Sequence, residues 1–357
     1  MKLLKTIPLL FFIAINLLIV VAMNFCAYTS CLPPQNHPST SYYGLMFPLF
    51  LILNSLFIPF WLIFKWKITL LPLLGTLLCA GSARAYFPLN LPKEPPQGSL
   101  KILSYNVMAF GKGNIAEWEQ NPILNYILES DADILCIQEA QKALVDKAFD
   151  RITEVYPYHS LELKAENYIV CFSKYPICSA EMIDYPTRSN YSFAYQVLVG
   201  TDTLLVINNH LESYRLSQTD KSDYKSIIKN YKHPERNGSE EKYFSLMEKL
   251  ASHDSIRGYQ VDSVAAYVER HVGQHIIVCG DFNASPISYA HHRLTQTLND
   301  AYTRSGNGPG ISYHRSGMYF RLDHILVSPN VTAYGAKVDR SITESDHYPI
   351  FCYVKLE

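Results

Sequence analysis

The sequence predicts an α+β sandwich domain that is preceded by transmembrane helices. Charged residues are absent from Thr6 to Phe64, whereas they are frequent in the rest of the chain. Beyond residue 100, strand-like apolar runs and helical patterns follow one another without strict alternation, which favours an α+β sandwich over a doubly wound parallel sheet. A chain of 357 residues is long enough for both parts.

The charge balance separates the two parts further. Residues 1–100 hold six of the 31 basic residues and one of the 32 acidic residues, so the remainder has a net charge of −6. The long uncharged stretch excludes a wholly soluble protein. The acidic remainder excludes a strongly basic polymer-coating protein, and the frequent apolar and aromatic residues exclude a disordered chain.

Three apolar segments in residues 1–87 predict a membrane anchor. A helix needs about 20 apolar residues to cross the hydrocarbon core. The predicted spans cover about residues 7–23, 45–64 and 68–87. A Pro-rich stretch with Gly98 and Ser99 follows at residues 88–99, which indicates a semi-rigid linker, so a globular domain is expected over residues 100–357.

The basic residues of the anchor predict its orientation. Lys2 and Lys5 flank the first span, Lys65 and Lys67 separate the second from the third, and the loop 24–44 contains no Lys or Arg. The positive-inside rule places both basic clusters in the cytoplasm. Three crossings then make this a multi-pass integral membrane protein whose residues from 88 onward are extracytoplasmic, either periplasmic or extracellular.

Two other interpretations of the anchor stay open. The first span has the basic start and apolar centre of a cleaved signal peptide, although no clean small-x-small cleavage site follows it. The third segment could instead form a re-entrant or interfacial hairpin, which would leave the domain in the cytoplasm. We also expect Trp61 and Trp66, near a span end, to belong to an interfacial aromatic belt.

The cysteines fall into three groups. Cys26 and Cys31 lie in the loop expected outside the membrane and could pair there, whereas Cys79 lies in a span. The remaining cysteines lie in apolar, strand-like runs, where core burial is expected, and their spacing fits no zinc motif. These are Cys136, Cys171, Cys178, Cys279 and Cys352.

Eight runs in the domain have the apolar character of strands. They are Lys101–Val107, Asp133–Gln138, Tyr168–Phe172, Phe193–Val199, Leu204–Asn208, His275–Cys279, Asp323–Val327 and Ile350–Val354. Helical patterns cover about Ile115–Glu129, Ala140–Ile152 and Glu240–Val272. The interval Tyr214–Asn237 is polar and suits either an anion-attracting loop or a solvated surface. Its basic residues include Lys221, Lys225, Lys229, Lys232 and Arg236.

Polar residues gather at the ends of these strands. Asn106, Glu139, His210, Asp281 and Asn283 come at the carboxyl ends, whereas Asp323 opens a strand and Asp346 and His347 precede the last strand. Taken singly, an Asp or Asn beside a strand is usually a turn residue, and a lone His beside a strand is usually a surface or core group. Six such sites in one chain instead predict a polar cluster held at the edge of a rigid sheet.

The residue types indicate metal-assisted chemistry. Glu139, with Asn106 and Asp346, offers hard oxygen ligands, which suit Mg²⁺ or Mn²⁺ better than Zn²⁺. The two histidines and the other acids remain for proton transfer and phosphate contact. Such a site fits attack of water on a phosphoester. The chain has neither a phosphate-binding Gly-x-x-x-x-Gly-Lys loop nor a Gly-x-Ser-x-Gly nucleophile elbow.

Six segments together resemble the endonuclease/exonuclease/phosphatase superfamily, over essentially all of residues 100–357. In chain order they read LSYNV, IQE, NNHLES, GDFNASP, RLDHILVS and SDHYPI. The superfamily includes deoxyribonuclease-like nucleases, abasic-site endonucleases, inositol polyphosphate phosphatases and neutral sphingomyelinases. The resemblance implies a four-layer α/β sandwich around two mixed β-sheets and a divalent cation, Mg²⁺ or Mn²⁺.

The resemblance also implies roles for individual residues. Glu139 would be the main metal ligand, with Asn106 beside it and Asp346 as an accompanying metal or water-linked acid. Asp281 and Asn283 would orient the attacking water and contact the phosphate. His347 would be the general base or the phosphate-contacting histidine, paired with Asp323. His210 occupies a position where abasic-site enzymes have tyrosine, which favours the nuclease-like and phosphatase members.

Three substrate classes remain open: nucleic acid or a general phosphodiester, a phospholipid or its headgroup, and a small phosphoester of the inositol type. The acidic domain lacks the general positive field of nucleic-acid binding, whereas tethering beside a bilayer favours a lipid. A catalytically inactive phosphate-binding member is the alternative of another class. The membrane is an expected partner, and nothing in the sequence indicates an obligate protein partner.

Overall fold

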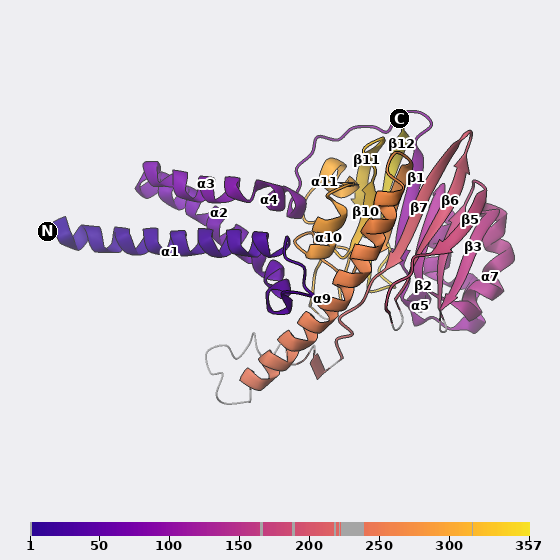
Figure 1. The fold of residues 1–357 in the computed structure, drawn as a ribbon, viewed down its shortest axis with the longest axis horizontal. Coiled ribbons are helices and arrows are strands. Elements are labelled where there is room, and N and C mark those ends of the chain that lie inside the picture. Colours follow the sequence, from indigo (N-terminus) through magenta and orange to yellow (C-terminus); the bar gives the residue numbers. More distant parts are fainter. Residues whose placement is uncertain are drawn as a thin grey trace.

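Two mixed β-sheets of six strands each form the centre of the domain in the computed structural model (Figure 1), which describes residues 2–164, 167–187, 190–217, 219–220, 222, 239–315 and 317–357. The first sheet contains, in spatial order, β11 (Val331–Val338), β12 (Ile350–Leu356), β1 (Leu100–Asn106), β2 (Ile134–Gln141), β4 (Asn167–Ser173) and β3 (Tyr158–Lys164). The second contains β5 (Ile177–Met182), β6 (Ser192–Val199), β7 (Asp202–His210), β8 (His275–Asp281), β10 (Asp323–Val327) and β9 (Asn299–Asp300). The pairs β1–β2 and β7–β8 are parallel, and the other strand pairs are antiparallel.

The inner faces of the two sheets meet in one apolar core. It contains Ile102 of β1, Val206 of β7 and Ile325 of β10, all at most 3% exposed. Four of the five cysteines expected in the core are there, namely Cys136, Cys171, Cys279 and Cys352. The prediction was wrong for Cys178, which is exposed because β5 is an edge strand with an almost fully exposed burial pattern.

Helices cover the outer face of each sheet. The first sheet packs against α6 (Pro122–Glu129) and α7 (Lys142–Val155), and the second packs against α9 (Ser239–Arg270) and α10 (Tyr289–Leu294). Three shorter helical elements occur in the connections between strands and helices: α5 (Met108–Lys112), η3 (Ile115–Gln120) and α11 (Ala301–Ser305). The expected four-layer α/β sandwich is therefore confirmed.

The strands missed by the sequence prediction share one position. All eight expected strands are present, and the four others described, β3, β5, β9 and β11, are the edge strands of the two sheets. An edge strand has one unpaired side and much exposed surface, so its sequence does not form a continuous apolar run.

The helix expected over Ile115–Glu129 is divided at Asn121. The Asn121 carboxamide oxygen accepts hydrogen bonds from the amides of Ile123 and Leu124 at 3.0 and 3.1 Å, and Pro122 takes the first helical position. These are the residues preferred at a helix start, so α6 begins anew here. The next expected helix begins at Lys142 rather than Ala140 because β2 continues through Gln141.

The segment predicted to be the membrane anchor is called the anchor below for its predicted role. It consists of α1 (Lys2–Thr29), η1 (Pro38–Met46), α2 (Phe47–Phe64), η2 (Trp66–Thr69), α3 (Leu70–Leu78) and α4 (Ala80–Tyr86). Two helices, Pro8–Thr29 and Pro38–Phe64, are long and apolar enough to cross a membrane. The third expected span is bent by 73° between Trp66–Leu78 and Ala80–Tyr86, so a third crossing exists only if this bent pair counts as one span. Figure 1 shows α1, α2 and α3 side by side, projecting from the domain.

A buried polar network joins the three anchor helices. Asn54 of α2 receives a hydrogen bond from Asn16 of α1 at 3.2 Å and donates to the carbonyl of Pro72 and the hydroxyl of Thr76, each at 2.9 Å. Trp61 is 1% exposed and donates to Asn16, so its expected place in an interfacial belt was wrong. Polar contacts of this kind hold membrane helices together, because lipid offers no partner for them.

The anchor also contacts the domain. In the loop after α1, Gln35 donates to Asp262 of α9 at 2.7 Å, and Ser255 of α9 donates to the carbonyl of Pro34 at 3.0 Å. Ile287, from the segment after β8, is buried among anchor residues that include Met23 and Phe47. Cys26 is buried and Cys31 is exposed, and both thiols are free.

The segment between Tyr86 and Leu100 has no regular secondary structure and lies against the domain. The Asn90 side chain donates to the carbonyls of Thr303 and Gly306 at 3.2 and 2.6 Å. The amide of Gly308 donates to the carbonyl of Pro88 at 2.9 Å. These contacts attach the segment to the domain, in addition to the contacts that the loop after α1 makes with α9.

Candidate active site

Strand pairing brings the predicted residues of the second sheet to one edge. Asp281, the last residue of β8, is the register partner of both His210 at the end of β7 and Asp323 at the start of β10. Side chains at paired positions of neighbouring strands lie close together. Because β10 runs antiparallel to β8 and β7 runs parallel to it, the start of β10 lies beside the ends of β7 and β8.

Asn106 joins the two sheets at this edge. It ends β1, is 2% exposed, and its side-chain nitrogen donates to Glu139 Oε1 at 3.1 Å and to Asp281 Oδ2 at 3.0 Å. Its side-chain oxygen accepts from the amide of Met108 at 3.1 Å. Asn106 thus holds the carboxylate of one sheet beside the carboxylate of the other.

Glu139 lies in a distorted part of β2. The pairing of β2 with β4 shifts register between Ile137 and Ala140, and Glu139 has a φ of 54°. A non-glycine residue in this left-handed region is uncommon and costs about 1–3 kcal/mol, and such strain is typical of functional sites. The side chain is 34% exposed, so its carboxylate is accessible from solvent.

His210 faces both carboxylates. Its Nε2 lies 3.5 Å from Glu139 Oε1 and 3.9 Å from Asp281 Oδ2, and its side chain is 13% exposed. The backbone amide of His210 donates to the carbonyl of Tyr191 at 2.9 Å, which fixes the end of the strand.

Asp281 is a fully enclosed acid of the cluster. It is 1% exposed, and Asn283 donates to it twice, from the backbone amide at 2.8 Å and from the side chain at 3.2 Å. Asn283 has a φ of 49°, a conformation that asparagine tolerates better than most residues. Burial raises the pKa of Asp281 above its ordinary value, although the nearby His347 opposes this shift.

Asp323 and His347 form a buried pair. His347 Nδ1 lies 2.7 Å from Asp323 Oδ2, and His347 Nε2 lies 3.7 Å from Asp281 Oδ2. Burial alone would lower the pKa of His347, but the carboxylates of Asp323 and Asp281 outweigh it and raise this pKa to about 10. His347 is therefore protonated at neutral pH in the metal-free protein.

Asp346 is placed differently from the other predicted residues. Its backbone carbonyl accepts from the amide of His314 at 3.1 Å, and its carboxylate makes no hydrogen bond or ion pair within the described residues. It is close enough to raise the pKa of His347. The structure thus joins seven of the eight predicted residues by direct contacts and leaves the Asp346 side chain beside them.

Three residues that support the site were not predicted from the sequence. Ser345 donates to the carbonyl of Asn106 at 2.7 Å, and the Ser312 hydroxyl accepts from the amides of Leu322 and Asp323 at 3.0 and 3.1 Å. The Tyr313 ring lies edge-on to His347 with a centroid separation of 5.2 Å. Ser345 was visible within SDHYPI, whereas no sequence signal marked Ser312 or Tyr313.

The basic residues proposed as an anion-attracting loop, Lys221, Lys225, Lys229, Lys232 and Arg236, lie outside the described residues.

The donor set suits a hard divalent cation. Within the described part of the chain, Asn106 and His210 both contact Glu139 through Oε1, which leaves Oε2 for a metal ion. Asp281, Asp323 and His347 also offer ligand atoms within 4.8 Å of one another, but a pKa of about 10 keeps both ring nitrogens of His347 protonated at neutral pH, so this ring has no lone pair for a metal. Oxygen ligands with an accessible carboxylate fit Mg²⁺ or Mn²⁺.

Comparison with known proteins agrees with this fold. A family model described as the Endonuclease/Exonuclease/phosphatase family matches residues 103–347, and one for a domain of unknown function (DUF8431) matches residues 9–86. A humanized TDP2 of D. rerio has a similar structure, with a TM-score of 0.51, 17% identity, and coverage of 72% of this chain and 99% of that chain. A functionally unknown conserved protein of Enterococcus faecalis V583 has a TM-score of 0.50, 14% identity, and coverage of 72% and 100%. No curated protein matches the chain.

Proposed function

This chain belongs to the endonuclease/exonuclease/phosphatase family, and from that premise we propose that it is a membrane-anchored, metal-dependent phosphodiesterase. Members of the family are phosphoester hydrolases and generally use divalent metal ions. The main support is the pair of hydrogen bonds by which Asn106 holds Glu139 beside Asp281. In this proposal, residues 1–87 are the anchor, 88–99 the linker and 100–357 the catalytic domain.

The cation would be held by Glu139, with Asn106 and Asp346 beside it. When bound, it would neutralise phosphate charge and the charge that develops on the leaving oxygen. The exposed carboxylate of Glu139 supports this role. The Asn106 nitrogen faces the carboxylates in this structure, so its oxygen would reach a cation only after the amide turns over.

Asp281 is the residue best placed to accept a proton from the attacking water. Burial raises its pKa and so increases its basicity, and Asn283 fixes the orientation of its carboxylate through two hydrogen bonds. We therefore assign Asp281 as the general base and Asn283 as the residue that orients it.

His347 is better suited to contact the phosphate than to act as the base. Its pKa of about 10 keeps a proton on the ring at neutral pH, and Asp323 holds the ring by a hydrogen bond to Nδ1. A protonated imidazole stabilises the negative charge of a phosphoryl oxygen. His210, which lies near the carboxylates of Glu139 and Asp281, would be a second histidine in contact with the substrate.

The preferred substrate is a phosphodiester, and nucleic acid and membrane lipid are the two leading sources. One observation favours lipid as a second candidate function. Ile287, four residues after Asn283, is buried in the anchor cluster, so the segment that carries Asp281 and Asn283 is fixed beside the membrane helices. Confinement beside a bilayer raises the effective concentration of a lipid substrate.

A substrate panel tests this proposal. The full chain in detergent with Mg²⁺ would be assayed on bis(para-nitrophenyl) phosphate, single-stranded DNA, RNA, sphingomyelin and inositol phosphates. We expect turnover of the diesters, and a preference for sphingomyelin would select the lipid candidate. Binding of phosphate compounds without turnover of any substrate, with Mg²⁺ or Mn²⁺, would instead identify a non-catalytic binding protein.

The contacts between anchor and domain support an extracytoplasmic domain. If α1 and α2 each cross the membrane, the loop containing Gln35 and the residues near Lys65 lie on opposite sides. Gln35 is hydrogen-bonded to Asp262 of the domain, so the domain shares the side of that loop. The segment Trp66–Tyr86 must then cross back, despite its bend, which argues against a re-entrant hairpin. With Lys2 and Lys5 in the cytoplasm, that side is outside.

Tags at the two ends of the chain test this orientation. In cells whose cytoplasmic membrane is intact and whose outer membrane, if present, has been opened, we expect a tag after Glu357 to react with an antibody or protease added outside. A tag before Met1 should stay protected until the cytoplasmic membrane is permeabilised. Protection of both tags would place the domain in the cytoplasm and contradict the three-span orientation. Each tag serves as the matched control for the other.

A further inference from the structure

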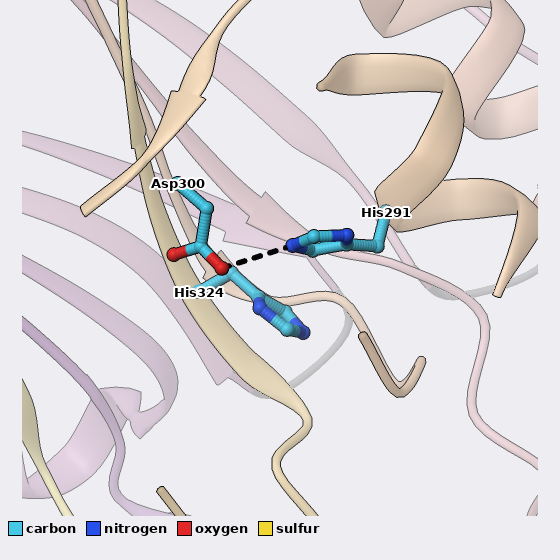
Figure 2. Close-up of side chains that lie close together, drawn as sticks. All are labelled: His291, Asp300 and His324. Carbon is cyan, nitrogen blue, oxygen red and sulfur yellow. Dashed lines mark hydrogen bonds and ion pairs between the residues drawn. The ribbon is translucent and has the colours of Figure 1, made fainter. Parts of the chain in front are cut away.

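A second polar cluster lies on the opposite face of the second sheet from the candidate active site. It consists of His291 in α10, Asp300 at the end of β9 and His324 in β10 (Figure 2), and each of the three is at most 5% exposed. His324 directly follows Asp323, and successive side chains of a strand point to opposite faces. Leu326, on the same face as His324, packs in the helix-covered core.

The three side chains converge with ligand-like spacing. His291 Nε2 lies 3.1 Å from Asp300 Oδ2, and each of the three residues offers a ligand atom within 4.8 Å of the other two. In a tetrahedral zinc site with bonds of about 2.0 Å, neighbouring ligand atoms are about 3.3 Å apart. Figure 2 shows the three side chains close together, coming from three different elements, with the His291 imidazole directed at the Asp300 carboxylate.

His324 has a buried nitrogen without a partner. Its Nε2 lies 2.9 Å from the carbonyl oxygen of Ala284, so this nitrogen bears the proton and donates. Its Nδ1 is buried and has no hydrogen-bond partner within the described residues. An unsatisfied buried polar atom is costly and calls for an explanation. A metal-bound histidine characteristically donates its other ring N–H to a carbonyl, which leaves such a lone pair for the metal.

Asp300 is held in a fixed orientation. Its Oδ1 accepts from the amide of Tyr302 at 2.8 Å, and its Oδ2 accepts from the hydroxyl of Thr303 at 2.7 Å. Arg321 is near enough to influence the pKa of Asp300, but the described ion pairs include none between them. The Arg321 guanidinium instead donates to the carbonyl of Ala85 in the anchor. Within the described residues, the only ion-pair partner of Asp300 is therefore the His291 imidazole, and a bound cation would replace the ring proton of His291 as the partner of this carboxylate.

We propose that His291, Asp300 and His324 bind a zinc ion at a structural site separate from the catalytic centre. Two imidazole nitrogens and one carboxylate oxygen are a ligand set that suits Zn²⁺ better than Mg²⁺. The ion would join α10, the turn from β9 into α11, and β10. It would thereby fix the strand that places Asp323 in the candidate active site.

Metal analysis of the purified full chain tests this site. Cells would be grown without added chelator, and the protein in detergent would be analysed for zinc by mass spectrometry. We expect about one zinc ion per chain, retained in Glu139→Gln, which alters only the catalytic centre. Loss of zinc is expected in Asp300→Asn and His324→Gln, together with a fall in Tm of about 5 °C or more. His292→Gln, the neighbour in α10 that lies outside the cluster, is the matched control.

Cobalt substitution keeps the proposal testable if the variants fail to fold. Wild-type protein stripped of zinc and given Co²⁺ should develop the intense visible absorption of tetrahedral cobalt, and added Zn²⁺ should remove it. A wild-type protein that contains no zinc and gives no such absorption would overturn the proposal. So would folded Asp300→Asn and His324→Gln variants that keep the zinc content of His292→Gln.

Discussion

Replacing Glu139 with glutamine is expected to lower phosphodiester turnover by at least about 100-fold, because it removes the accessible carboxylate proposed to hold the cation. Glutamine keeps the shape of the side chain, and its oxygen can still accept the hydrogen bond from Asn106. The free energy of unfolding should therefore change by no more than about 0.5 kcal/mol. Turnover and urea unfolding of the full chain in detergent measure the two effects.

A matched control separates the loss of charge from the loss of a ligand. Glu154 lies in the exposed last turn of α7, outside the candidate site. Glu154→Gln removes the same charge and should keep full activity. If Glu139→Gln retained more than about a tenth of wild-type turnover, Glu139 would not be the main ligand of an essential metal.

Replacing Asp323 with asparagine is expected to reduce turnover by about 10²–10⁴-fold. The change leaves the side-chain size unaltered but removes the negative charge that raises the pKa of His347. His347 would then lose its proton at a lower pH, and the ring would be less firmly oriented. Histidine NMR titration should show a lower pKa for His347 in Asp323→Asn than in the wild type, whereas an unchanged pKa would contradict the pairing.

The same pair predicts how stability depends on pH in the metal-free protein. The pKa of His347 rises from 6.5 to about 10 on folding, so its contribution is fully present below pH 6.5 and is lost as the pH rises through about 10. The difference in unfolding free energy between wild type and Asp323→Asn should therefore shrink between pH 7 and pH 10. Urea unfolding at several pH values measures this difference, and a gap that widens toward pH 10 would contradict the assignment.

The parts that could be predicted from the sequence depend on local patterns. The eight central strands are continuous apolar runs. The polar residues that follow or precede them, such as Asn106 and Asp281, lie at one edge of the sheets because pairing places the ends of neighbouring strands side by side. The edge strands could not be predicted, since their exposed side chains remove the apolar pattern. The division of the helix at Asn121 was readable in principle from the Asn-Pro pair.

The parts that could not be predicted depend on tertiary contacts. The left-handed conformation of Glu139 accompanies a bulge in the pairing of β2 with β4. No residue next to Glu139 in the sequence indicates this bulge. Asn106 and Asp281 are 175 residues apart in the chain and in different sheets. Likewise, Trp61 resembled an interfacial residue until its hydrogen bond to Asn16 showed it to be inside the anchor, and the contact of Gln35 with α9 had no sequence signal.

Metal-dependent turnover by the wild-type chain tests the central claim most directly. The full chain would be dialysed against EDTA and assayed on bis(para-nitrophenyl) phosphate before and after addition of Mg²⁺ or Mn²⁺. We expect no turnover by the metal-free protein and recovery in the wild type when either ion is added together with one equivalent of Zn²⁺, which refills the proposed structural site. Under the same conditions Glu139→Gln should recover at least about 100-fold less turnover than the wild type. Undiminished turnover in the presence of EDTA would contradict the proposal that Glu139 holds an essential metal ion for phosphodiester hydrolysis.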